Sequence, residues 1–135
     1  MDTERSYSSY PLSELTAQII GAAQAVHRGL GPGFRETVYQ RALEHELHQR
    51  GLDAAREVWI EVHYRGLRVG RHRVDFVVGD ASGAVMVEIK ARHELEDVHF
   101  VQTLSYLKAS GYPIGLLVDF GAKSLQVRRI ANTRH

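Results

Sequence analysis

The clearest alternation of apolar and polar positions in this chain lies in residues 84–90, which read Ala-Val-Met-Val-Glu-Ile-Lys. A period of two is typical of a β-strand, in which successive side chains point to opposite faces of a sheet. The branched apolar residues Val85, Val87 and Ile89 are therefore expected on one face. Glu88 and Lys90 share the other face, so the strand is predicted to present a charged pair.

A second apolar run, residues 74–78, precedes this strand, and the turn formers Gly-Asp-Ala-Ser-Gly fill residues 79–83 between the two runs. The pattern predicts a β-hairpin. With a loop of four residues, counting back along the ladder brings Asp75 opposite Glu88. Two carboxylates and Lys90 are then predicted to meet on one face of a sheet.

Opposed carboxylates repel each other unless a positive charge lies between them. Mg²⁺ would meet this need, since it binds hard oxygen ligands and often takes only one or two carboxylates. Lys90 would then assist an attacking water or a phosphate that gains charge. The alternative is an ordinary amphipathic hairpin that carries Asp75, Glu88 and Lys90 on its solvent face. The pattern alone leaves both interpretations open.

Two helices are predicted before the hairpin, because apolar residues recur there at helical spacing. The first begins at Ser13 as N-cap and ends at Gly29 or Gly31, and the second covers residues 36–50 with Gly51 as its left-handed cap. The second helix is expected to carry its inward-facing residues at Val38, Ala42, Leu43 and Leu47, with Tyr39 as a further core residue.

The middle of the chain predicts strands at residues 56–64 and 67–78, which with the strand of residues 84–90 form a three-stranded antiparallel meander. A third helix is expected from Glu96 or Asp97 to Ser110. Residues 114–118 form a continuous apolar run that suits a strand covered on both faces, and residues 125–130 form a last strand. The third helix is predicted to bury Val98, Val101, Leu104 and Leu107.

The composition is that of one soluble globular domain: 135 residues, 44% hydrophobic and 24% charged. The domain is expected at residues 13–131, between a flexible arm (1–12) and a tail (132–135). We expect a cytoplasmic protein, since neither a signal peptide nor a membrane span is visible in the sequence. The chain has no cysteine, which excludes disulfides and thiolate metal sites.

The net charge of +1 predicts weak attraction of the whole molecule to a polyanion, so a phosphate partner must meet a local patch. Arginines crowd residues 65–73, just before Asp75, and could contact a sugar-phosphate backbone. A charged edge strand that prevents aggregation explains the same arginines. The arginines of this segment are Arg65, Arg68, Arg71 and Arg73, and a smaller group near the C-terminus contains Arg128, Arg129 and Arg134.

Three residues of the third helix are candidates for the same site. Gln102 and Tyr106 lie four positions apart and share a helix face, and His99, one turn before Gln102, could face the same cleft. The eight histidines contain no His-x-x-x-His pair, so a zinc site built from histidines is not expected.

Laid out in this order, the chain resembles the PD-(D/E)xK nuclease superfamily, with Asp75 and the run Glu88-Ile89-Lys90 at its motif. Within it the chain looks like the small bacterial GxxExxY family, whose signature fits Gly33-Phe34-Arg35-Glu36-Thr37-Val38-Tyr39. The resemblance extends from Ile20 to Ile130. It implies an α/β (α+β) fold with a restriction-endonuclease-like core: two N-terminal helices, the antiparallel meander, a helix, and one or two further strands.

The resemblance also implies roles for single residues. Asp75 and Glu88 would hold Mg²⁺ or Mn²⁺, Lys90 would position the nucleophilic water, and Glu36 matches an extra acidic residue of many members. Gln102 and Tyr106 resemble the Gln-x-x-x-Tyr element of the exonuclease-like branch. The expected metal ligands are thus Asp75, Glu88 and Glu36, the catalytic set adds Lys90 and Gln102, and the expected substrate contacts are Tyr106, Arg73, Arg71 and His99.

The expected function is metal-dependent hydrolysis of phosphodiester bonds in DNA or RNA. The alternative, of another class, is a nucleic-acid-binding or protein-interaction module that retains the nuclease fold without cleaving. A homodimer is compatible with both, because cutting a duplex requires two sites. Binding of Mn²⁺ separates the two functions, since only the first requires it.

Overall fold

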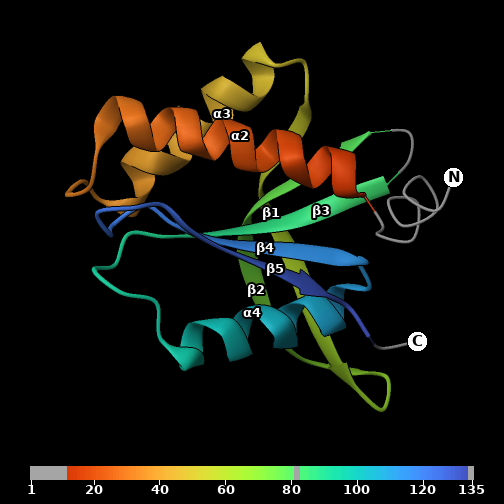
Figure 1. Ribbon diagram of the computed structural model, residues 1–135. Helices are drawn as coiled ribbons and strands as arrows, with labels where there is room; N and C mark the ends of the chain where they lie inside the picture. Colours follow the sequence, from red (N-terminus) through yellow and green to blue (C-terminus); the bar gives the residue numbers. More distant parts are fainter. Residues whose placement is uncertain (1–11, 81–82, 134–135) are drawn as a thin grey trace, which may run out of the picture.

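The computed structural model describes residues 12–80 and 83–133, which form three helices and one five-stranded sheet (Figure 1). Two helices come first, three strands follow, and a helix then separates these from the last two strands. This order confirms the predicted α+β fold. The elements are α2 (Ser13–Leu30), α3 (Glu36–Gln49), β1 (Asp53–Tyr64), β2 (Leu67–Asp80), β3 (Gly83–Lys90), α4 (Asp97–Ser110), β4 (Ile114–Asp119) and β5 (Gln126–Ala131).

The strands lie in the sheet in chain order, β1-β2-β3-β4-β5. All neighbours are antiparallel except β3 and β4, which are parallel. Parallel neighbours require a crossover, and α4 supplies it. Because both faces of β3 and β4 are covered, all six residues of β4 are buried, which confirms the expectation for the apolar run.

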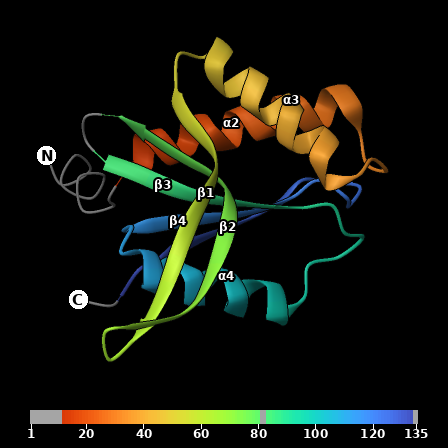
Figure 2. The ribbon, with the colours of Figure 1, turned by 180° about the vertical axis from the view of Figure 1, so that it is seen from behind.

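The sheet is covered by helices on both faces (Figures 1 and 2). On one face α2 and α3 pack over a core that contains Phe76, Val87 and Ile89. On the other face α4 covers a smaller core that contains Val74, Met86 and Leu107. Val87 and Met86 are neighbours in β3 and belong to different cores, so the alternation predicted for this strand is confirmed.

The predicted register of the β2–β3 hairpin is also confirmed. Val78 pairs with Val85 and Gly79 with Ala84. The ladder described between the two strands ends at Phe76 and Val87, one position before Asp75 would face Glu88.

Two predictions about the first two helices are wrong. Ser13 is the first helical residue of α2 and not its N-cap; Leu12 holds that position with a φ of 59°. Val38 is 38% exposed, because the buried side of α3 runs through Tyr39, Gln40, Leu43 and Leu47. Gly31 (φ 70°) caps α2 and Gly51 has a φ of 76°, as the sequence predicts for the two breaks.

The buried side of α4 differs most from the prediction. Val98 and Val101 are 50% and 56% exposed, and α4 buries His99 and Thr103 beside Leu107, which was predicted correctly. His99 is held at the helix start, where its side chain and that of Glu96 form a reciprocal capping box. This rotates the two valines toward solvent.

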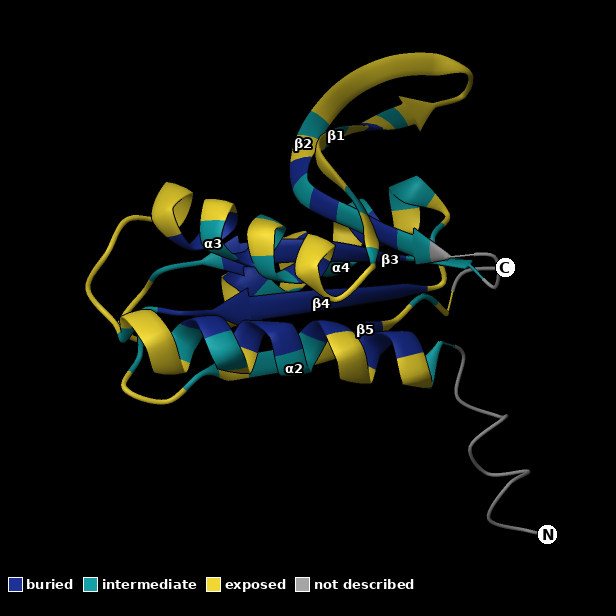
Figure 3. Ribbon diagram, turned by 90° about the horizontal axis from the view of Figure 1, so that it is seen from above, coloured by how far each residue is buried: buried dark blue, intermediate teal, exposed yellow. Residues whose placement is uncertain are grey.

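Strand β1 begins earlier than predicted, at Asp53, and β2 ends later, at Asp80. The opposite ends of the two strands project beyond the helices (Figure 3). We call their outer part, residues 58–73, the hairpin arm. All of residues 63–71 are exposed, since no helix covers both faces of the sheet there. Within the described ranges, no helix combines the length and the apolar character needed to cross a membrane.

Candidate functional site

Asp75 lies where β2 stops alternating between the two cores. Val74 belongs to the core under α4 and Phe76 to the core under α2 and α3, although residues two apart in a regular strand share one face. On the neighbouring strand, the facing residue Glu57 has a φ of 58°. Strands β1 and β2 are therefore both irregular at Asp75, and the side chain of Asp75 lies in neither core.

The carboxylate of Asp75 accepts a hydrogen bond from the backbone of β3, as a backbone carbonyl of β2 would in a regular ladder. Its Oδ2 accepts a hydrogen bond of 2.7 Å from the backbone amide of Ile89, and the backbone amide of Asp75 donates to Glu88 Oε1 over 3.3 Å. The side chain of Asp75 thus bonds to the backbone of β3, and the side chain of Glu88 bonds to the backbone of β2. We call these two residues the carboxylate pair.

The pKa of Asp75 is raised to about 7. Burial is the largest cause, and the charge of Glu88 together with a hydrogen bond to Glu88 acts in the same direction. The amide of Ile89 and the charge of Lys90 oppose the shift. The predicted meeting of two carboxylates and a lysine is therefore found, and the carboxylates repel each other as expected.

Glu36, at the start of α3, interacts with the charges of Asp75 and Lys90. Burial raises its pKa, the positive charge of Lys90 opposes this rise, and the charge of Asp75 adds to it. A hydrogen bond from the backbone of Ala91 favours the charged form of Glu36. The start of α3 thus contacts the chain just after Lys90.

Two neighbours hold the carboxylate pair in place, and neither was identified from the sequence. Gln40 of α3 is buried and donates a 3.0 Å hydrogen bond to Asp75 Oδ1. His72 Nε2 lies 2.7 Å from Glu88 Oε2, and the His72 ring stacks on Tyr106 of α4 with centroids 4.2 Å apart. Tyr106 therefore reaches the site through His72.

Of these two neighbours, only Gln40 has a signal in the sequence. Gln40 follows Glu36 by one helical turn, so the two share a face of α3. His72 was missed because regular alternation places it on the face opposite Asp75, and the irregularity after Val74 removes this separation.

Asp119 is a third residue near the site that was not identified from the sequence. It is fully buried at the end of β4, and its Oδ1 accepts hydrogen bonds from the backbone amides of Arg92 (2.8 Å) and Gly121 (3.1 Å). The amide of Phe120 also donates to the carbonyl of Lys90 over 2.9 Å. These bonds fix the chain directly after Lys90. Asp119 Oδ2 is buried without a hydrogen-bond partner.

Of the remaining predicted site residues, only Arg73 lies beside the carboxylate pair. Arg73 lines a pocket of about 170 Å³ together with Glu36, Gln40 and Asp75. Arg71 lies over the Trp59 ring, Gln102 is exposed on α4, and His99 is buried in the capping box. The position of His99 favours a structural role over the expected substrate contact.

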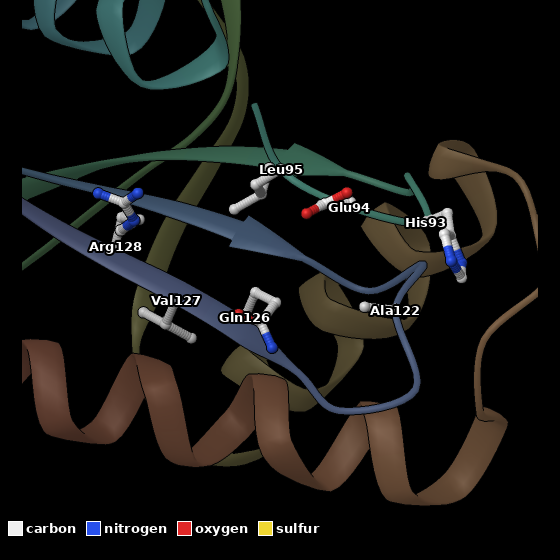
Figure 4. A pocket seen from close by; sticks show the side chains of 7 residues that line it. All are labelled: His93, Glu94, Leu95, Ala122, Gln126, Val127 and Arg128. Carbon is white, nitrogen blue, oxygen red and sulfur yellow. The ribbon is translucent and has the colours of Figure 1, made fainter. Parts of the chain in front are cut away.

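A larger cavity, of about 470 Å³, lies between β5 and the segment after β3 (Figure 4). Polar side chains dominate its lining, but none of the predicted site residues contributes to it. We place the candidate site at the carboxylate pair, because converging acids and a shifted pKa indicate chemistry more directly than volume does. The cavity is lined by His93, Glu94, Leu95, Ala122, Gln126, Val127 and Arg128.

The donor set fits Mg²⁺ better than a metal that needs a full protein cage. In residues 12–80 and 83–133, no three His, Cys, Asp or Glu side chains are arranged as a metal site. The expected three-carboxylate set of Asp75, Glu88 and Glu36 is therefore not assembled. Two carboxylates are nevertheless enough for Mg²⁺, which usually keeps several waters.

Comparison with solved structures places the fold among known ones. The chain matches a structure titled "Crystal structure of SSO0001" with a TM-score of 0.58 and 20% identity over 71% of this chain. The chain spans 50% of the length of that protein. Comparison with curated proteins gave no match.

The family comparison covers nearly the whole described chain. A model described as "PD-(D/E)XK nuclease superfamily" matches residues 13–130. The match contains the irregular strand with Asp75, the β3 residues Glu88 and Lys90, and the helices on both faces of the sheet. The chain therefore belongs to the PD-(D/E)XK nuclease superfamily.

Proposed function

We propose that this protein hydrolyses phosphodiester bonds in nucleic acid with the help of Mg²⁺ or Mn²⁺. The observation that carries the proposal is the carboxylate pair, in which Asp75 and Glu88 are hydrogen-bonded to each other's strand while the charge of Lys90 acts on Asp75. Membership of the superfamily supports the same chemistry.

In this proposal, Asp75 and Glu88 hold the ion. When bound, the ion neutralises the scissile phosphate and lowers the pKa of a bound water. Lys90 orients the attacking water or stabilises charge that develops on the phosphate. Glu36 lies beside this group and interacts with Lys90, so we place it next to the ion and not on it.

Gln40 and His72 orient the ligands. Gln40 donates to the oxygen of Asp75 that Ile89 does not use, and His72 occupies one oxygen of Glu88. Each oxygen of the two carboxylates thus has one hydrogen-bond partner, which leaves a second lone pair on each oxygen for an ion. Since a ligand must be deprotonated to bind a metal, we expect binding to weaken as the pH falls below about 7, where Asp75 takes up its proton.

We also propose membership of the GxxExxY family, on the way its signature positions Glu36. The Tyr39 hydroxyl donates to the carbonyl of Gly31 and accepts a hydrogen bond from the amide of Phe34. The Tyr39 ring stacks on Phe120 at 4.8 Å, and Gly33 has a φ of 115°. These contacts fold the segment before α3 back on the helix, so that Glu36 begins the helix beside Lys90.

The test combines metal binding and cleavage. Calorimetric titration with Mn²⁺ should give a heat signal that Glu88→Ala abolishes. Single- and double-stranded DNA and RNA, incubated with Mg²⁺ or Mn²⁺, should be cut at least about 100-fold more slowly by Lys90→Ala and by Asp75→Asn. Lys108→Ala, which removes an exposed lysine of α4, is the matched control and should cut at the wild-type rate.

Two results would contradict the proposal. Cleavage that survives both Lys90→Ala and Asp75→Asn would assign the activity to another site or a contaminant. Binding of nucleic acid with neither Mn²⁺ heat nor cleavage would favour the non-cleaving module, a function that requires no metal ligands.

A further inference from the structure

Trp59, the only tryptophan of the chain, lies on the hairpin arm and is 49% exposed. Two arginines of β2 lie over its ring: the guanidinium of Arg71 is 4.1 Å from the ring centroid and that of Arg73 is 5.3 Å away. Both distances are within the range of a cation–π contact. We call Trp59, Arg71 and Arg73 the stacking platform.

The register of the hairpin explains why the three side chains meet. Trp59 pairs directly with Arg73, and Arg71 is the diagonal neighbour on the same strand. Ile60 and Val74, the next residue on each strand, are buried in the core under α4. The stacking platform therefore lies on the face of the arm turned away from α4 and, as the exposure of this arm shows, no helix covers that face (Figure 3).

The stacking platform is continuous with the candidate site. Arg73 lines the same pocket as Asp75, Glu36 and Gln40. Asp75 follows Arg73 by two residues in β2, a rise of about 7 Å along a strand. A chain of nucleotides that contacts the ring of Trp59 therefore needs to extend only a short way to bring a phosphate to the carboxylate pair.

We propose that the stacking platform binds an unpaired base of single-stranded nucleic acid and so directs single strands to the carboxylate pair. A base stacks on an aromatic ring or a guanidinium plane only when it has left its own helical stack. The arginines add phosphate contacts, although the net charge of the whole chain is only +1. The ion pair between Arg73 and Glu57, at 3.7 Å and largely exposed, is weak enough for a phosphate to replace it.

The inference that single strands are the substrate rests on the proposed function. Binding of single strands does not rest on it, so we test binding without metal. Because Trp59 is the only tryptophan, its fluorescence reports the stacking platform alone. In EDTA, a single-stranded oligonucleotide should quench this fluorescence. A blunt duplex of the same sequence, and a strand of equal length without bases, should quench it far less.

Variants separate stacking from charge. Labelled single strands should bind Trp59→Ala about 5- to 100-fold more weakly, with Trp59→Phe between this variant and wild type. Arg71→Gln should lower the salt dependence of binding by about one unit of slope, as loss of one phosphate contact does. Tyr64→Ala removes another exposed aromatic of the arm, under Arg65, and should bind like wild type.

The result that overturns the inference is equal quenching by the strand without bases, or equal affinity for duplex and single strand. Absence of binding to DNA and RNA alike would overturn it as well and leave the surface to a protein partner. Cleavage assays on the same protein distinguish the two proposals. Quenching by single strands together with no cleavage by the wild type supports the stacking platform and contradicts the nuclease, whereas Lys90→Ala should lose cleavage and keep the quenching.

Discussion

The carboxylate pair and the hairpin arm share strand β2, yet their charged side chains have different surroundings. At the carboxylate pair, burial raises the pKa of Asp75 and each carboxylate is fixed by specific donors. On the arm, the charged side chains are half exposed and pair across the ladder, as Arg68 does with Glu61. Helices on both faces of the sheet make this difference, because they exclude water from one end of β2 and leave the other end in solvent.

Burial decides which chemistry each part of this fold can carry. A desolvated charge interacts strongly with an ion or a proton, whereas an exposed charge is screened by salt. The inner end of the hairpin therefore suits metal binding and proton exchange. The outer end suits the reversible contacts that guide a polyanion.

The largest contrast is expected from two glycines. Gly121 lies beside the segment that follows Lys90, and Gly70 lies on the hairpin arm. A Cβ on Gly121 would lie 2.4 Å from the carbonyl carbon of Ala91 and from the amide nitrogen of Arg92, whereas a Cβ on Gly70 would meet no atom within 4 Å. Gly121→Ala should lower the free energy of unfolding by about 3 kcal/mol or more, since backbone must move. Gly70→Ala should change it by less than about 1 kcal/mol.

Urea denaturation of both variants measures this contrast. Mn²⁺ titration should also show weaker binding in Gly121→Ala, because the clash falls on the residues directly after Lys90. Equal effects of the two substitutions would mean that the two ends of the sheet are packed alike, and the comparison would fail.

The next effect is a dependence of stability on pH. In the folded protein the pKa of Asp75 is about 7, against an ordinary value of 3.8. Between these values the folded state holds a proton that the unfolded state has lost, so stability falls as pH rises from about 4 to about 7. We expect a loss on the order of 2–4 kcal/mol over this range. Burial raises the pKa of Glu36 in the same direction.

Denaturation in EDTA at several pH values checks this expectation. Asp75→Asn should remove most of the loss, because asparagine has no proton to release. Added Mn²⁺ should restore stability above pH 7 in the wild type only. A wild-type protein whose stability does not change between pH 4 and pH 7 would contradict the burial of the carboxylate pair.

The sequence predicted those features of the site that depend on local pattern. Alternation and turn residues fixed the register of β2 and β3, and the register brought Asp75 close to Glu88. Gln40 and Asp119 were missed because their contacts join elements far apart in the chain, and His72 was missed because regular alternation places it on the face opposite Asp75. The interruption of β2 at Asp75 in particular has no signature in the apolar pattern, and it is this interruption that lets both His72 and Asp75 reach Glu88.

The helices show the same limit. In α2 the apolar spacing identified the buried side correctly, as at Ile19, Ala23 and Val26. In α4 it was correct for Leu104 and Leu107 and wrong for Val98 and Val101, because the capping box holds His99 in the interior and turns these two valines outward. Apolar spacing gives the buried side of a helix only when no polar residue has a structural reason to be inside.

The smallest effects compare a single hydrogen bond at each end. Gln40→Ala removes the donor to Asp75 Oδ1 and should cost about 1–3 kcal/mol in the free energy of unfolding, since a buried acceptor loses its partner. The side chains of Arg68 and Glu61 form a 3.3 Å ion pair and are 52% and 49% exposed. Arg68→Ala removes this ion pair. It should cost less than about 0.5 kcal/mol, and 1 M salt should abolish this cost.

The two variants are compared by urea denaturation at pH 8, where Asp75 is charged and its need for a donor is greatest. If Gln40→Ala costs no more than Arg68→Ala, water reaches Asp75 and replaces the lost amide. Water would then reach the carboxylate pair as easily as it reaches the hairpin arm. The raised pKa of Asp75 would have to come from repulsion by Glu88 alone. If the two costs differ as expected and salt changes only the smaller one, burial is the cause, and the carboxylate pair has the dry surroundings that tight binding of an ion requires.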